Sequence, residues 1–170
     1  MELRQRKKNR LQGYDYGRAG YYFITICIEK RAAMLGKVVR ACRGAHCAPA
    51  HVVLSDVGQN VEHAILQIPK HHPNVSVDKF VVMPNHVHMI ICLDENDGRA
   101  MRAPTCGSSI PQIVRGMKEA VTKTLGFNMW QKSYHDHIIR NDADYRRIWE
   151  YIDTNPSKWR EDCYYEERKQ

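Results

Sequence analysis

Short runs rich in β-branched and aromatic residues alternate with longer stretches of helical periodicity along this chain. The first run, 20–28 (GYYFITICI), predicts a strand. Two further runs, 75–83 and 87–93, predict a central pair of strands, and a shorter, more polar run within 130–140 is consistent with another. We therefore expect an α+β domain built on an antiparallel sheet with helices packed on one face.

Three segments have the spacing of amphipathic helices. The first follows a Ser-Asp pair at 55–56, a typical helix start, and is expected to end at Pro69. The second follows the serines at 108–109 and continues to about Leu125, and the third covers 142–155. Each alternates with strand segments, which favours one domain rather than two.

Two segments, 40–51 and 94–109, interrupt this alternation and contain glycine, proline and arginine. We interpret both as surface loops inserted into one domain, with a short strand possible at 51–54. The first loop holds four potential zinc ligands, Cys42, His46, Cys47 and His51. Their spacing matches no standard zinc finger or ribbon, which favours a loop without metal.

Composition excludes several classes of protein. With 170 residues, 43% hydrophobic and 26% charged, the chain is typical of a globular protein with a single core. No apolar run approaches the roughly 20 residues that span a bilayer, and the N-terminus lacks the apolar stretch of a secretory signal. We therefore expect a cytoplasmic protein with no membrane partner, whose six cysteines are reduced thiols.

The formal net charge of +7 favours an anionic partner, of which nucleic acid is the commonest. From charge alone, a basic protein without such a partner is an equal alternative. Basic residues are concentrated in an N-terminal arm, 1–20, whose interleaved tyrosines could stack on bases. The candidate DNA-binding residues of this arm are Arg4, Arg6, Lys7, Lys8, Arg10, Tyr14 and Tyr16. A disordered, solubilising tail is the alternative interpretation.

Lys118 is a further candidate for contact with nucleic acid. It lies in the second predicted helix and directly follows the core position Met117. A solvated helix face is the alternative explanation for its charge.

The rest of the chain is organised around the stretch Met83–Ile91, which contains His86 and His88. Side chains two apart on a strand point to the same face, so the two imidazoles project together while Val87 points into the core. Two imidazoles on one rigid strand supply most of a metal site that lacks only an oxygen ligand. His135 and His137 form a second such pair, but their flanks are more polar, which favours the first pair.

The last predicted helix places a tyrosine beside its apolar side. That side consists of Tyr145, Ile148, Trp149 and Ile152. Tyr151 lies about 110° around the helix axis from the centre of the stripe, where packing can hold its hydroxyl open to a ligand. Asn155 follows one turn later on the same flank. If this helix packs beside the central strand, His86, His88 and Asn155 could bind one Mg²⁺ or Mn²⁺ ion, with Tyr151 as the nucleophile toward a bound phosphate.

Five motifs occur in order along nearly the whole chain. They are GYDY at 13–16, YFIT at 22–25, VMPNHVH at 82–88, WQKSYHDHIIR at 130–140 and YIDTNP at 151–156. The set resembles the tyrosine transposases of the HUH endonuclease superfamily, in particular the REP-associated tyrosine transposases. An HxH pair alone is a weak signal, whereas the ordered set is specific.

This resemblance implies a ferredoxin-like or RRM-like catalytic domain over 21–156, preceded by the arm and followed by a tail at 157–170. It implies His86 and His88 as metal ligands, Tyr151 as the nucleophile and Asn155 near the position of the third ligand. We expect the tail to be poorly ordered.

The implied reaction is cleavage of single-stranded DNA, often beside a hairpin, that leaves a 5′-phosphotyrosine and a free 3′-OH. The resemblance also implies that residues 13–16, including Asp15, and the basic arm contact DNA flanking the hairpin. The protein would act as a monomer or a homodimer with a divalent metal, Mg²⁺ or Mn²⁺.

Two alternatives stay open at this point. One is a nucleic-acid-binding regulator on the same fold that has no catalytic activity. The other is a metal phosphodiesterase in which the ion activates water and Tyr151 is structural.

Overall fold

A four-stranded antiparallel sheet forms the centre of the structure. The computed structural model describes Leu11 and residues 13–40, 42–43, 46–47, 49–95 and 108–165. The main strands are β1 (Gly20–Cys27), β6 (Val75–Val82), β7 (His86–Leu93) and β8 (His135–Ile139), in the order β6-β7-β1-β8. All neighbouring strands are antiparallel. The predicted α+β architecture is therefore confirmed.

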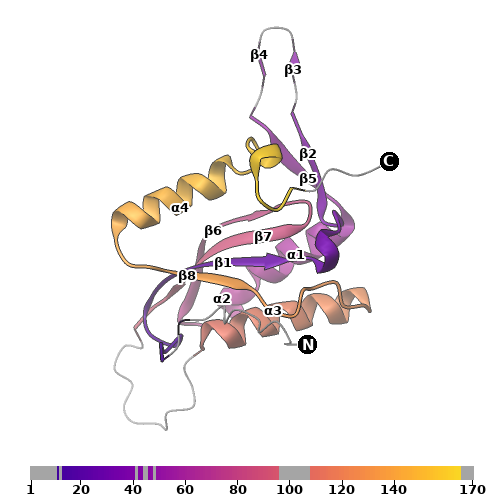
Figure 1. Cartoon of the computed structure of the whole chain (residues 1–170). Helices are drawn as coiled ribbons and strands as arrows, with labels where there is room; N and C mark the ends of the chain where they lie inside the picture. The colour runs from indigo at the N-terminus through magenta and orange to yellow at the C-terminus, as the bar shows by residue number, and fades with distance from the viewer. Residues whose placement is uncertain are drawn as a thin grey trace, which may run out of the picture.

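Three helices cover one face of this sheet. They are α1 (Asp56–Leu66), α2 (Ile68–His71) and α3 (Ile110–Leu125), and they lie together on one side in Figure 1. Alternate side chains of the two central strands point toward them, including Ile24 and Ile26 of β1 and Val87 and Met89 of β7, all of which are buried. This alternation forms the main core and directs the intervening residues of β7 to the opposite face.

The fourth helix, α4 (Asp142–Thr154), lies over that opposite face (Figure 1), so the expectation that the helices pack on one face alone is wrong. Ile148 and Ile152 pack there against Ile90 and Ile139 in a second, smaller core. The predicted apolar stripe is wrong in one place, because Trp149 is 37% exposed and its ring lies 5.0 Å from Lys79 Nζ. This second layer is thin, so polar groups on the same face of β7 can form a site.

Local sequence signals explain where α1 and α3 begin. Ser55 caps α1 through its hydroxyl, which accepts from the Gly58 amide at 3.1 Å, and Ser109 caps α3. The expectation that Pro69 closes the first helix is wrong, since α1 ends at Leu66 and Pro69 lies in the first turn of α2. A proline is tolerated in that turn because its missing N–H has no partner in a helix.

The expected loop at 40–51 is instead part of a two-stranded arm. β2 (Gly36–Val39) pairs with β5 (His51–Leu54), and the pairing resumes between β3 (Cys42–Arg43) and β4 (His46–Cys47). Figure 1 shows the arm extending away from the main sheet. The side chains of three of the four potential zinc ligands lie outside the described set, as does most of the predicted loop at 94–109.

The expectation of a poorly ordered tail is wrong for residues 157–165. This segment forms turns and a short 3-10 helix, η2 (Trp159–Glu161), and then returns to the sheet. Arg31 donates to the Cys163 carbonyl at 2.9 Å, and Asn85 Nδ2 donates to the Tyr164 carbonyl at 2.8 Å. These bonds bring Asp162 next to β7.

Across the described ranges, no helix combines the length and apolarity that a bilayer crossing requires.

Candidate metal centre and reactive tyrosine

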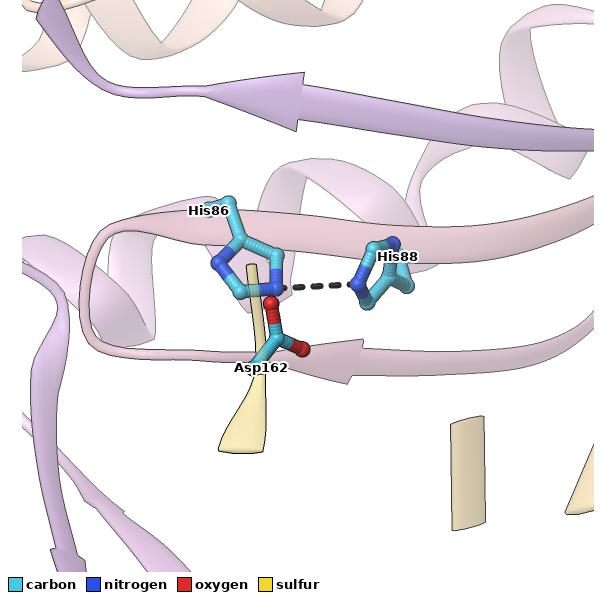
Figure 2. A group of neighbouring side chains, drawn as sticks. All are labelled: His86, His88 and Asp162. Atoms are coloured by element: carbon cyan, nitrogen blue, oxygen red, sulfur yellow. Dashed lines mark hydrogen bonds between the residues drawn. The ribbon is translucent and has the colours of Figure 1, made fainter. Parts of the chain in front are cut away.

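His86 and His88 lie side by side on β7, on the face that α4 partly covers. Both imidazoles are almost fully buried, and their Nε2 atoms are 2.9 Å apart (Figure 2). Two nitrogen ligands in adjacent positions of an octahedral ion at about 2.1 Å would be separated by about 3 Å. The strand thus presents the two nitrogens at a spacing that suits a shared cation.

Neighbouring side chains fix the orientation of each ring. Asn85 Oδ1 lies 2.8 Å from His86 Nδ1, and Thr25 Oγ1 lies 2.8 Å from His88 Nδ1. Because Asn85 Nδ2 donates to the carbonyls of Arg31 and Tyr164, its oxygen must be the atom that faces His86. Nδ1 of His86 therefore donates to Asn85, and its Nε2 carries a lone pair.

The second imidazole has more freedom. A hydroxyl can donate or accept, so Thr25 supports either tautomer of His88. The contact with the lone pair on His86 Nε2 requires the Nε2–H tautomer of His88. In the other tautomer, Nδ1–H donates to Thr25 Oγ1 and Nε2 carries a lone pair, which is the form that a metal ligand would require.

Burial keeps both imidazoles neutral at physiological pH. It lowers the pKa of His86 to about 4, although the nearby Asp162 charge acts in the opposite direction. Burial and the neighbouring His86 also lower the pKa of His88 well below its ordinary value. Neutral imidazole is the form that binds metal, so protons compete little for this site near neutrality.

Asp162 completes a group of three potential ligands with the two histidines (Figure 2). One ligand atom from each residue lies within 4.8 Å of the others, and within the described part of the chain no other such group of His, Cys, Asp and Glu is found. The sequence analysis missed Asp162, which lies in the segment expected to be a loose tail. The available signal was its aromatic surroundings, Trp159, Tyr164 and Tyr165, which are unusual in a disordered segment.

Asn155, the predicted third ligand, contacts the carboxylate of Asp162. It is buried at the end of α4, and its Nδ2 donates to Asp162 Oδ2 at 2.6 Å. Its Oδ1 is also buried and has no hydrogen-bond partner among the described residues. Asn155 therefore positions Asp162 with one end of its amide, and a ligand role for the other end stays a prediction.

Tyr151 brings a hydroxyl to the edge of the same group. Its oxygen lies 3.2 Å from His88 Nε2 and donates to Asp162 Oδ2 at 3.2 Å. The ring meets Phe23 and His88 edge to face, yet the residue is 37% exposed. The structure thus places the hydroxyl where the helix geometry predicts it, held by packing and open to solvent. Burial and the negative charge of Asp162 raise the pKa of this phenol above its usual range.

The other histidine pair is arranged differently. His135 and His137 of β8 are both exposed, and His137 Nε2 lies 2.6 Å from Asp144 Oδ2. Among the described residues, neither His135 nor His137 belongs to a group of three potential metal ligands.

Comparison with known proteins places these observations in a family, although no family model matches the chain. An uncharacterized protein of Haemophilus influenzae is 35% identical over 179 residues, which cover 96% of this chain and 94% of that protein. The REP-associated tyrosine transposase of Escherichia coli is 28% identical over 84% of this chain and 70% of its own length.

A putative REP-associated tyrosine transposase of H. influenzae is 26% identical over 85% of this chain and 74% of its own length. A solved structure of a REP-associated tyrosine transposase bound to a REP hairpin superimposes with a TM-score of 0.63 and 26% identity. It covers 88% of this chain and 73% of that one. The chain is a homologue of the REP-associated tyrosine transposases.

Homology to transposases relates this chain to DNA-processing enzymes, so the predicted DNA-binding residues need to be located. Arg4, Arg6, Lys7, Lys8 and Arg10 lie outside the described residues.

The GYDY motif packs at the start of β1. Tyr14 is half-buried, with its hydroxyl 3.2 Å from that of Tyr22, and Asp15 is exposed. Base stacking is a wrong expectation for Tyr16, because its ring is 7% exposed in the main core and its hydroxyl donates to Asp136 at 2.6 Å. Tyr16 therefore anchors the approach to the sheet.

Lys118 lies on α3, on the side of the sheet away from the histidines. Its Nζ donates to the carbonyls of Gln131 and Ser133 at 2.9 and 3.0 Å. Burial lowers the pKa of this ammonium to about 8. Its immediate role is to hold the segment before β8 against α3, and direct contact with DNA stays a prediction.

Proposed function

We propose that the protein is a metal-dependent single-strand DNA endonuclease and strand transferase that forms a 5′-phosphotyrosine intermediate at Tyr151. The supporting observation is the position of the Tyr151 hydroxyl, 3.2 Å from both His88 Nε2 and Asp162 Oδ2. A candidate nucleophile, its hydrogen-bond acceptor and a group of potential metal ligands lie together at the partly exposed Tyr151.

The residues present suit a divalent ion with mixed nitrogen and oxygen ligands. His86 and His88 would supply two nitrogens and Asp162 an oxygen. The buried, unpartnered Oδ1 of Asn155 is an atom of the kind a cation would satisfy, which supports the predicted ligand role. Such a donor set accepts Mg²⁺ or Mn²⁺. The bound ion would stabilise negative charge on the phosphoryl oxygens as the P–O bond breaks.

The chain's own residues then perform the transfer. Tyr151 Oη attacks the phosphorus and gives up its proton to Asp162, which already accepts its hydrogen bond. The new bond joins the tyrosine oxygen to the phosphorus, and the bond to the 3′ oxygen breaks. That oxygen takes up a proton and leaves as a free 3′-OH. Attack by a 3′-OH on the phosphotyrosine reverses these events and joins two strands.

The substrate class follows from the relatives. One related transposase has been solved bound to a REP hairpin. We infer that this chain also acts on a DNA hairpin with single-stranded flanks. Its net charge of +7 is consistent with such a partner.

The decisive experiment incubates the protein with a labelled single-stranded hairpin oligonucleotide and Mn²⁺, and separates products on a denaturing gel. A covalent protein–DNA adduct should form and should disappear in Tyr151→Phe. Tyr145→Phe is the matched control, because this tyrosine is on the same helix but its hydroxyl donates to Asp78 at 3.0 Å.

Two results would contradict the proposal. Cleavage that survives Tyr151→Phe would indicate a phosphodiesterase that uses activated water. Binding of the hairpin without cleavage by the unmodified protein, with Mn²⁺ or Mg²⁺ present, would indicate a regulator without catalytic activity.

A further inference from the structure

One row of residues leads from the candidate metal site to the edge of the sheet. Thr25 of β1 pairs with His88 on one side and with His135 of β8 on the other. All three point to the α4 face, because they are directly opposite one another in the ladder. α4 contacts the sheet mainly through β6 and β7, and His135 is exposed. Thr25 is only 3% exposed, so DNA could contact this row at its exposed His135 end.

The row ends at an open edge. β8 is the last strand of the four-stranded sheet. Tyr134, the residue before His135, points to the opposite side and is buried in the main core. The chain at 128–134 thus runs from this edge along α3, on the far side of the sheet.

A groove of about 770 Å³ lies between α3 and segment 128–134. On the α3 side, the groove is lined by the basic residues Arg115, Lys118 and Lys123. Lys132 lines it from segment 128–134. Glu119 is the one acidic residue that lines it. The groove is therefore basic and within the size range of ordinary ligand sites.

The cations have distinct roles. Lys118 is committed to the carbonyls of Gln131 and Ser133, so it sets the width of the groove by tying the two walls together. Lys123 and Lys132 are exposed, and Arg115 forms only a long, exposed pair with Glu119 at 3.8 Å. Three exposed positive charges thus line a groove whose lining includes Tyr134, the residue before β8.

We propose that this groove binds the phosphate backbone of one single-stranded flank of the DNA, which reaches it from Tyr151 past the β8 edge at His135. The floor favours backbone contacts over base stacking, because the Trp130 ring is buried and its Nε1 donates to the Lys118 carbonyl at 3.3 Å. Binding in the groove is therefore electrostatic and independent of sequence. This assignment rests on the proposed function, since it takes the DNA to be held at Tyr151.

The test measures how much each flank contributes to affinity. Fluorescence anisotropy is recorded with three hairpin oligonucleotides, one with both flanks, one with the 5′ flank alone and one with the 3′ flank alone. All proteins carry Tyr151→Phe, so binding is read without cleavage. The groove variant is Lys123→Ala/Lys132→Ala. Lys37→Ala/Lys70→Ala removes the same charge from exposed positions outside the groove.

In the groove variant, the gain in affinity from one of the two flanks should fall toward onefold, while the gain from the other flank persists. The slope of log Kd against log salt concentration should flatten by about 1.4 for the flanked hairpin, because each phosphate that a lysine no longer neutralises lowers the slope by about 0.7. The control pair should keep both gains.

Three results would overturn the inference. Retention of both gains in the groove variant would show that the groove does not hold a flank. An equal loss on all three oligonucleotides would indicate general electrostatics. Failure of the Tyr151→Phe protein to bind any oligonucleotide would overturn the proposed function together with the groove.

Discussion

The Tyr151 hydroxyl donates to Asp162 at 3.2 Å, although Tyr151 lies in α4 and Asp162 directly follows η2. Asn155 donates to the same oxygen of Asp162 at 2.6 Å. One carboxylate thus connects the predicted nucleophile with the pair of buried histidines. Its removal should affect metal binding and chemistry together.

We expect Asp162→Asn to weaken Mn²⁺ binding by at least about tenfold. Losing a neighbour of a ligand commonly costs 10–100-fold, and loss of a charged ligand should cost no less. Isothermal titration calorimetry with Mn²⁺ in the absence of DNA measures this directly. Glu161→Gln is the control, because this neighbouring acid is exposed and outside the group of ligands. Equal affinity in the wild-type protein and Asp162→Asn would exclude Asp162 as a ligand.

A second prediction concerns the hydrogen bond between Thr25 and His88. Thr25→Val keeps the side-chain shape and removes the hydroxyl, which leaves His88 Nδ1 buried without its partner. An unsatisfied buried group costs about 1–3 kcal/mol, and the ring also loses the support of its metal-binding tautomer. Mn²⁺ affinity should fall by about tenfold or more.

Thr25→Ser provides the rescue for this test, because it restores the hydroxyl while removing a methyl group. It should recover most of the Mn²⁺ affinity. If Val and Ser behave alike, the contribution of Thr25 is packing, and the proposed orientation of His88 is wrong.

The parts of the site that sequence could predict are those controlled by local periodicity. The two-residue repeat of a strand places His86 and His88 on one face, and the 3.6-residue repeat of α4 places Tyr151 beside its apolar stripe. Asp162 lies beyond Pro156, where neither repeat applies. Its position depends on hydrogen bonds from Arg31 and Asn85 to the carbonyls of Cys163 and Tyr164, which are long-range and invisible to periodicity.

The same distinction explains which parts of the fold could be predicted from the sequence. Four strands and three long helices were predictable because each buries a regular stripe of residues. The two-stranded arm was predicted only at 51–54, which is β5, because the chain before it carries little apolar alternation, and among the described residues its strands pair only with each other. The burial of Tyr16 was also hidden, because its partner Asp136 is distant in sequence.

Two helical glycines should respond in opposite ways to alanine. A Cβ on Gly58 would lie 1.9 Å from the Leu35 carbonyl oxygen, so α1 could not keep its close approach to the chain just before β2. Gly58→Ala should lower the free energy of unfolding by about 1–3 kcal/mol, the usual cost of overpacking. Gly116 of α3 is exposed, and a Cβ there meets no atom within 4 Å.

Gly116→Ala should therefore raise the free energy of unfolding by about 0.5–1 kcal/mol, the gain in helix propensity. Urea unfolding followed by circular dichroism measures both variants. Stabilisation by both substitutions would show that α1 can move away from Leu35.

The last prediction concerns pH and the wall of the basic groove. Burial lowers the pKa of Lys118 from 10.5 to about 8. Between these values the unfolded chain holds a proton on this residue that the folded chain has released. The contribution of Lys118 to the free energy of unfolding should therefore rise with pH across this window, and it is lost progressively as the pH falls from 10.5 to about 8.

Lys118→Met removes this titrating group and the two bonds to Gln131 and Ser133. We expect the difference in unfolding free energy between wild type and variant to grow from pH 8 to pH 10, in favour of the wild type. Urea titrations of both proteins at the two pH values give this difference, and titration of the other groups cancels in it. Lys123→Met is the control, because this exposed lysine of the same helix should show no such growth. A constant difference for Lys118→Met would show that the ammonium stays charged in the folded state and is held by the two carbonyls alone.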